Sequence, residues 1–411
     1  MGLKQRLDGV KEFLDRQDHN YRMMLLRSGG ANFLMRLTMD YSSYYTKELG
    51  ASNSVIAYLS SISSFISMII SLPAGWVMDR FNLKHVIGIG MIFQVGMVGM
   101  YAFAQNWVWI LGAMILNPFT MALIFRSQSI MISNSLRDTD RATGMSLRMI
   151  VAQILGLMSP MSAAMVIKYF GGISVEGIRP LYYVRLVGTV VLYGYIYWNL
   201  LDVEPQTKRG KTKFLEDFGD VLNSNKGLKP FIIVAGGGAI VWSTMQAFTM
   251  IWCIDVKGAD ELTIGYMTTV SIITTIIFAI PLSRIADEQG RKRAFIITRP
   301  ALWIWIAIIV YAPSPRWLIV GWFFRGLGMS SSAYETLQIE LVPADQRGRW
   351  LGLVNVFSAL VRIPAPILGA YLFDSGLPAL TFLVPLAVDM LIRTPILQIW
   401  VPETLKKPSN D

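Results

Sequence analysis

Charged side chains inside strongly apolar segments are the residues whose chemistry says most about this chain. Arg36 and Asp40 lie four residues apart in one such segment, and Tyr44 follows at the same spacing, so a helix would place all three on one face. A charge at the depth of a bilayer core is costly and usually faces a partner or a water-filled cavity. The spacing therefore predicts either a self-neutralising Arg36–Asp40 ion pair or the wall of a polar cavity.

Other polar side chains recur in later apolar segments. Those that we expect to converge on the same cavity wall are Arg126, Trp242, Gln246, Asn355 and Arg362. Guanidinium groups at membrane depth suit an anionic or amphipathic anionic substrate, because their N–H groups match carboxylate and phosphate oxygens. The alternative for Arg126 and Arg362 is pairing with backbone carbonyls or a buried carboxylate. Asp389 and Arg393 are expected to form a local pair.

Two carboxylates are candidates for proton coupling. A coupling group must titrate near the working pH and sense a conformational change. Glu335 has no basic residue within two turns of its own helix, whereas an adjacent Arg36 favours the ionised form of Asp40. We therefore expect Glu335, ahead of Asp40, to carry the proton.

A membrane-spanning helical scaffold must position these residues. Hydrophobic residues make up 53% of the 411 residues, charged residues only 16%, and the mean hydropathy is +0.46. A helix needs about 20 apolar residues to cross the hydrocarbon. The twelve expected spans cover residues 23–47, 54–78, 85–104, 107–135, 143–169, 180–201, 229–255, 262–286, 294–312, 316–341, 350–373 and 377–401.

The chain repeats itself at an offset of 208 residues. Residues Gly50, Ala51, Ile56, Tyr58, Ser63, Pro73, Asp79 and Lys84 recur as Gly258, Ala259, Ile264, Tyr266, Ser271, Pro281, Asp287 and Lys292. The repeat predicts an all-α membrane protein with two pseudo-symmetric six-helix bundles, over residues 1–200 and 229–411, joined by a polar linker at 201–228. The first bundle includes an amphipathic N-terminal segment. A seam between such bundles is where a transporter can hold a ligand.

The basic residues are distributed unevenly over the loops. With both termini on one side, the opposite loops hold few of the 37 Lys and Arg residues, namely Lys47, Lys168, Arg179, Lys257 and Arg316. This asymmetry follows the positive-inside rule, so we expect both termini in the cytoplasm. The net charge of +10 then faces lipid headgroups, and a nucleic-acid partner is not expected. The single cysteine excludes an intramolecular disulfide.

Matched charged loops follow the second span of each half. Residues 75–84 read GWVMDRFNLK and residues 283–292 read SRIADEQGRK. Together they resemble the G-x-L-A-D-R-x-G-R-K loop of the major facilitator superfamily. The first copy has Asn82 in place of the second glycine, and the second copy has Glu288 in place of the arginine. The resemblance covers essentially the whole chain and implies that superfamily's twelve-helix fold.

The resemblance also implies a conformational lock between the halves, formed by residues of these loops and their neighbours. The candidates are Asp79, Arg80, Arg137, Arg141, Asp287, Arg291, Glu340 and Arg347. The alternative is that they only cap helix ends and fix topology.

These features predict a secondary transporter that moves a small molecule by alternating access. The leading expectation is proton-coupled export of amphipathic compounds, as by an antiporter. The alternatives are uptake or exchange of an organic anion and, in a different class, a transport-inactive receptor or lipid scramblase. No nucleotide-binding loop, metal-ligand cluster or hydrolytic triad is visible. We therefore expect no enzymatic activity, no metal and no cofactor, in a monomer of the cell membrane whose partners are lipid, substrate and a proton or another coupling ion.

Overall fold

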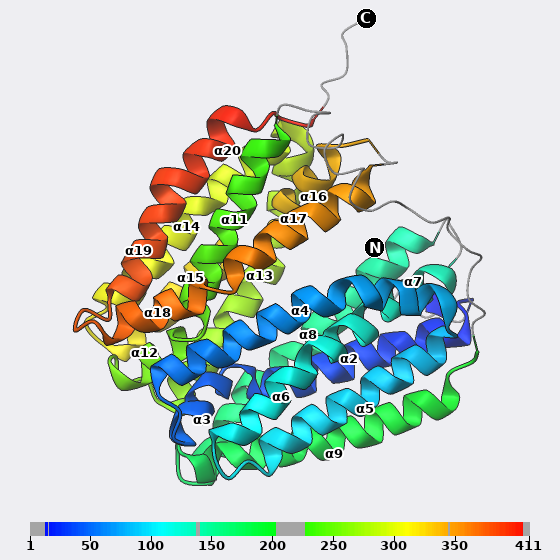
Figure 1. Ribbon diagram of the computed structural model, residues 1–411, viewed down its shortest axis with the longest axis horizontal. Coiled ribbons are helices and arrows are strands. Elements are labelled where there is room, and N and C mark those ends of the chain that lie inside the picture. The colour runs from blue at the N-terminus through cyan, green and yellow to red at the C-terminus, as the bar shows by residue number, and fades with distance from the viewer. Residues whose placement is uncertain (1–12, 15, 137–139, 203–226, 344–345, 406–411) are drawn as a thin grey trace, which may run out of the picture.

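The computed structural model describes residues 13–14, 16–136, 140–202, 227–343 and 346–405 (Figure 1). Within these ranges every regular element is a helix. The N-terminal half contains α2 (His19–Met39), α3 (Ser42–Glu48), α4 (Asn53–Arg80), α5 (Leu83–Ala102), α6 (Trp107–Thr120), the π-helical turn η1 (Met121–Phe125), α7 (Arg126–Asn134), α8 (Arg141–Tyr169) and α9 (Val175–Asn199). The expected linker and the N-terminal amphipathic segment lie largely outside the described residues.

The C-terminal half follows the same order of long and broken helices. It contains α11 (Leu228–Gln246), α12 (Thr249–Asp255), α13 (Glu261–Gln289), α14 (Arg291–Tyr311), α15 (Pro315–Gly328), α16 (Ala333–Glu340), α17 (Arg347–Arg362), α18 (Ala365–Asp374), α19 (Leu380–Val388), the π-helical turn η2 (Asp389–Arg393) and α20 (Thr394–Trp400). The repeated glycines Gly50 and Gly258 both adopt positive φ, at 89° and 67°, where they end the first broken helix of each half. Glycine is the residue that takes this conformation without steric cost.

Nine helical segments of the described chain are long and apolar enough to cross a membrane. The three expected spans outside this set, around 23–47, 180–201 and 316–341, are helical but more polar. Two of them are broken by short irregular stretches and carry charges at Arg36, Asp40 and Glu335. A charge-bearing, interrupted helix in a membrane protein is tolerated where it faces protein or a cavity. All-helical architecture is thus confirmed, and a full set of twelve spans remains a prediction.

The two bundles meet at one end and diverge at the other (Figure 1). We call the end with the short loops the loop end, and the opposite end, where both halves' terminal segments lie, the termini end. One cluster of buried apolar residues joins both bundles, whereas two further clusters are confined to residues 13–200 and 228–401. Apolar packing between the bundles therefore closes the loop end.

Polar contacts reinforce this closure. Lys47 forms an ion pair with Asp255, and Asn53 Nδ2 donates to Asp374 Oδ1 at 2.7 Å. The hydroxyl of Ser61 donates to the carbonyl oxygen of Ile363 at 2.6 Å. Lys47 and Asp255 are separated by 208 residues, which is the repeat offset, so they occupy equivalent positions in the two halves.

Candidate substrate cavity

Three adjoining hollows lie between and within the bundles. The N-cavity, of about 590 Å³, is lined by α2 and its neighbours in the N-terminal bundle, and the C-cavity, of about 460 Å³, lies in the C-terminal bundle. A smaller apical pocket of about 160 Å³ joins them. Gln246 lines both this pocket and the N-cavity, and Trp242 lines both this pocket and the C-cavity. The seam expected from the repeat is therefore hollow.

The N-cavity wall is rich in arginine. It is lined by four arginines, Arg27, Arg36, Arg148 and Arg185, and no Asp or Glu occurs among its described lining residues. Arg27 is 2% exposed and Arg185 is 8% exposed. Their known partners are neutral, since Arg27 donates to the Gln128 amide oxygen and Arg185 Nη1 donates to Thr38 Oγ1 at 2.6 Å. The wall therefore carries positive charge that its described side chains do not neutralise.

Arg36 and Asp40 do not contact each other in the described part of the chain. Arg36 Nη2 donates to Gln153 Oε1 at 3.1 Å and its Nε donates to Asn32 Oδ1 at 3.3 Å. Asp40 instead accepts a hydrogen bond from Thr268 of α13 at 2.8 Å. The cause is that α2 ends at Met39, so Asp40 lies in the turn between α2 and α3. Arg36 lines the N-cavity and Asp40 lines the apical pocket.

Tyr44 does not share their cavity wall, contrary to expectation. The break at Asp40 ends the helical register that would have aligned it with Arg36. Tyr44 lies in α3, is 9% exposed, and packs within the apolar cluster at the loop end. The Lys47 ammonium lies 5.7 Å from the centre of its ring. Tyr44 therefore belongs to the closed loop end and not to the cavity wall.

The C-cavity gathers four of the expected side chains. Trp242, Glu335, Asn355 and Arg362 all line it, from α11, α16 and α17. Glu335, Asn355 and Arg362 are exposed to this hollow. The wall is also aromatic, because Phe295, Trp305 and Tyr334 line it as well.

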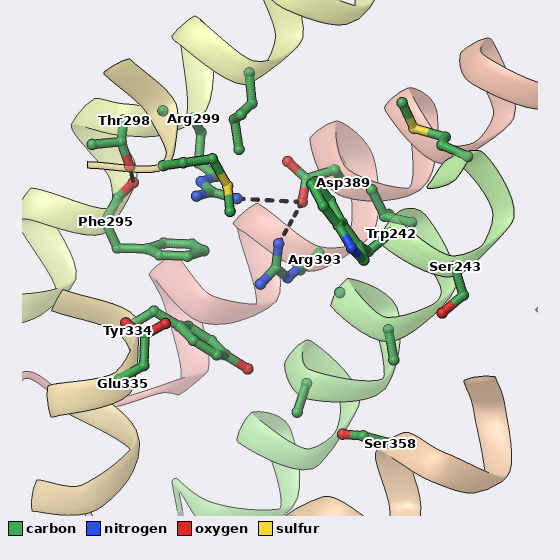
Figure 2. Close-up of a pocket in the computed structure, with 18 of the residues that line it drawn as sticks. Trp242, Ser243, Phe295, Thr298, Arg299, Tyr334, Glu335, Ser358, Asp389 and Arg393 are labelled. Atoms are coloured by element: carbon green, nitrogen blue, oxygen red, sulfur yellow. Dashed lines mark hydrogen bonds and ion pairs between the residues drawn. The ribbon is translucent and has the colours of Figure 1, made fainter. Parts of the chain in front are cut away.

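A buried charged cluster in the C-cavity includes a residue that sequence reasoning did not single out. Asp389 Oδ1 accepts from Arg393 Nη1 at 2.9 Å, which confirms the expected local pair, and Arg299 Nη1 lies 4.0 Å from the same oxygen (Figure 2). The turn η2 places Asp389 and Arg393 on this wall. Gly238 makes room, because a Cβ at this position would lie 2.8 Å from the Arg393 guanidinium carbon. The buried arginine within an apolar span was the available signal for Arg299.

Arg325 is a second residue that the sequence did not single out. It lines the apical pocket, donates from Nη1 to Ser271 Oγ at 3.2 Å, and lies 5.6 Å from the ring centres of both Trp242 and Trp305. Asp40 lies within electrostatic range of this guanidinium and of Arg36. The apical pocket thus brings one carboxylate of the N-terminal bundle close to an arginine of the C-terminal bundle.

The candidate lock residues fall into two groups. Asp287, Arg291 and Glu340 come together at the termini end, where Arg291 pairs with Asp287 and its Nε lies 3.4 Å from Glu340 Oε2. Arg347 is exposed. Arg137 lies outside the described residues. The side chains of Asp79, Arg80 and Arg141 also lie outside the described part of the structure, as does that of the cavity candidate Arg126. The described cluster joins helices within one bundle, so a lock between bundles stays a prediction.

Comparison with known proteins identifies the family. The chain matches the model of the Major Facilitator Superfamily over residues 29–261 and 231–411. It is 29% identical over 94 residues to organic cation/carnitine transporter 7 of Arabidopsis thaliana, which covers 21% of this chain and 19% of that protein. It is 27% identical over 128 residues to the niacin transporter NiaP of Acinetobacter baylyi, which covers 28% of this chain and 29% of that protein. The chain therefore matches less than a third of the length of these curated relatives.

Solved structures show the same fold over nearly the whole chain. The nucleoside transporter NupG superposes with a TM-score of 0.72 at 15% identity, covering 92% of this chain and 98% of that one. A POT family transporter in complex with 5-aminolevulinic acid gives a TM-score of 0.72 at 12% identity over 93% and 96% of the chains. A bacterial homolog of the human lysosomal transporter Spinster, in an inward-facing and unoccupied conformation, gives 0.65 at 14% identity over 93% and 95%. With the family match across both halves, the chain belongs to the major facilitator superfamily of membrane transporters.

Proposed function

We propose that this transporter carries a small organic anion through the hollow between its bundles. The observation that carries the proposal is the N-cavity wall, with four arginines and no acidic side chain among its described lining residues. At 4 Å and an effective dielectric constant of about 20, each opposite-charge contact contributes about 4 kcal/mol before desolvation is counted. An anionic ligand supplies the counter-charge that this wall lacks.

The opposite wall favours a flat or aromatic anion. Trp242, Phe295, Trp305 and Tyr334 line the C-cavity and offer ring faces for stacking. One relative is named as a transporter of niacin, which is an aromatic carboxylate. The other is named for organic cations and carnitine, and the arginines of the N-cavity disfavour a purely cationic ligand here. Transport, and not catalysis, is the activity that we assign to these residues.

Proton-coupled uptake is the transport mode that we propose. Moving one negative charge inward against a membrane potential of 100 mV costs about 2.3 kcal/mol, which a co-transported proton offsets. Asp40 is our candidate carrier, ahead of Glu335, because its hydrogen bond to Thr268 connects the two bundles. Protonation of Asp40 removes an acceptor charge at the point where the bundles must separate. We further propose that the protein acts as a monomer in the cell membrane with both termini in the cytoplasm, an orientation that the Lys and Arg asymmetry supports.

Proteoliposomes test this proposal. The purified protein is reconstituted, and uptake of radiolabelled benzoate or niacin is measured with and without an imposed inward proton gradient. Arg36→Gln should reduce uptake at least 10-fold, while Arg316→Gln, an exposed loop-end control, should leave it unchanged. Equal uptake by the Arg36 variant and the unmodified protein contradicts the anion proposal.

A second experiment addresses the coupling group and the direction. Asp40→Asn should abolish the response of uptake to the proton gradient, and Glu335→Gln should retain it. The aromatic C-cavity also supports the other transport mode, proton-coupled export of amphipathic compounds, which predicts that an outward-directed dye flux replaces anion uptake. A scramblase instead moves labelled lipid without any gradient, and a transport-inactive receptor moves nothing.

A further inference from the structure

The charged cluster on the C-cavity wall holds more positive than negative charge. Asp389 is 3% exposed and has both carboxylate oxygens engaged, since Oδ1 accepts from Arg393 and Oδ2 accepts from Trp303 Nε1 at 2.8 Å. Arg299 reaches Oδ1 only at 4.0 Å, which is beyond hydrogen-bond range. One carboxylate thus serves two guanidinium groups and satisfies only one of them directly.

Arg299 is a buried cation with donors to spare. It is 8% exposed, and its Nε has no hydrogen-bond partner among the described residues. Its guanidinium carbon lies 4.1 Å from the centre of the Phe295 ring, and that of Arg393 lies 5.2 Å from the same ring. A ring face fixes the orientation of a guanidinium but leaves its N–H edge available. In Figure 2 both arginines extend toward Asp389 in the pocket.

The surrounding charges do not cancel this excess. Three arginines line the C-cavity, Arg299, Arg362 and Arg393, against two carboxylates, Glu335 and Asp389, so one positive charge remains. A buried donor without an acceptor is unfavourable, and an anion entering the hollow would relieve it. The planar guanidinium fork matches the two oxygens of a carboxylate.

We propose that Arg299 and Arg393 form a second anion subsite, and that the substrate carries two acidic groups. One group binds the arginines of the N-cavity, which rests on the proposed function, and the other binds Arg299 beside the Arg393–Asp389 pair. A dianion held at both sites makes charged contacts with both bundles, whereas a monoanion makes such contacts with one bundle only. A ligand stabilises the conformation in which it makes most contacts, so the dianion would favour closure of the hollow around itself.

Binding of matched ligands to the purified full chain tests the proposal. Isothermal titration calorimetry compares benzoate with the three positional isomers of benzenedicarboxylate, which present the second carboxylate at three spacings. At least one dicarboxylate should bind at least 10-fold more tightly than benzoate. Arg299→Gln should remove this preference by weakening the dicarboxylate much more than benzoate, whereas the control Arg316→Gln should leave the binding of both ligands unchanged. The proposal is overturned if no dicarboxylate binds more tightly than benzoate, or if Arg299→Gln weakens both ligand types equally.

A second variant keeps the test informative if Arg299→Gln folds poorly. Asp389→Asn removes the resident counter-charge and keeps an oxygen that can accept from Trp303. The variant should gain a larger thermal stabilisation from the best dicarboxylate than the unmodified protein does. An unchanged or smaller ligand-induced stabilisation means that the cluster is structural only. Arg36→Gln separates the two proposals, because it should weaken the binding of benzoate and of the dicarboxylates alike. If it does not, the proposed function is contradicted, whatever the ratio of the Kd values for benzoate and the dicarboxylates.

Discussion

The two walls of the central hollow come from a duplicated scaffold but carry different chemistry. In the N-terminal wall, Arg36 donates to the neutral amides of Asn32 and Gln153, whereas in the C-terminal wall Arg393 donates to the carboxylate of Asp389. By the repeat offset, the position equivalent to Arg36 is Thr244, a fully buried residue that donates to the backbone of Ala365. The duplication therefore preserves the helical frame, while the polar wall has diverged position by position.

The largest effect that separates the walls should follow from removing the single acid of the C-terminal cluster. Asp389→Ala leaves the buried guanidinium groups of Arg299 and Arg393 without their partner, and breaking a buried pair costs about 3–5 kcal/mol. We expect a clear drop in the midpoint of thermal unfolding, measured in detergent by intrinsic fluorescence. A variant that unfolds at the same temperature as the unmodified protein would mean that this wall is not held by its ion pairs.

Substitution of an arginine in the N-terminal wall should instead weaken ligand binding and leave the stability of the protein unchanged. Arg36→Gln removes a charged donor that faces the hollow, and a hydrogen bond to a charged group contributes about 1.5–3 kcal/mol. We expect the Kd for benzoate to rise at least 10-fold while the unfolding midpoint stays unchanged. Loss of stability without loss of binding would place Arg36 among the structural groups.

A smaller change should come from the glycines that face Arg393. A Cβ added at Gly238 would lie 2.8 Å from the guanidinium carbon, while one added at Gly237 would lie 3.6 Å from Arg393 Cβ, which is an ordinary contact. Gly238→Ala should destabilise the protein by about 1–3 kcal/mol, because the guanidinium group that must shift is held by Asp389 and by the carbonyl oxygen of Val234. Gly237→Ala is the matched control and should be nearly neutral. Equal unfolding midpoints for the two variants would contradict the close packing of Gly238 against Arg393.

The smallest effect is expected at the loop end, outside both walls. Lys47 and Asp255 form a partly exposed ion pair, and such pairs contribute about 0–1 kcal/mol. Lys47→Gln should change the unfolding midpoint little and reduce closure of the loop end slightly, as measured by the accessibility of an engineered cysteine at Ala51, which is 4% exposed. The control is Lys168→Gln, another exposed basic residue on the loop-end side of α8. A large stability loss from Lys47→Gln would show that the loop end depends on charge rather than on its apolar packing.

Local patterns in the sequence predicted what depends on short spacing. The helical segments and the Asp389–Arg393 pair both follow from residues within a few turns of each other. The contacts that were missed join distant segments. Arg299 lies near Asp389 from another helix, and Arg325 stacks near Trp242, a residue of α11.

Breaks in the helices account for the expectation that was wrong. Tyr44 was aligned with Arg36 and Asp40 on the assumption of one continuous helix, but α2 ends at Met39 and α3 begins at Ser42. The sequence carries no proline or glycine at this break, so helix propensity did not predict that the helix ends here. The same interruption directs Asp40 to Thr268 across the seam, a contact that no periodicity in one segment can predict.

The contact between Lys47 and Asp255 also bears on the history of the chain. In a homodimer of one ancestral half, equivalent positions that meet on the twofold axis would hold the same residue, and two like charges there would repel. The opposite charges now found at these two positions could arise only once the copies mutated independently. This ion pair is therefore younger than the gene duplication.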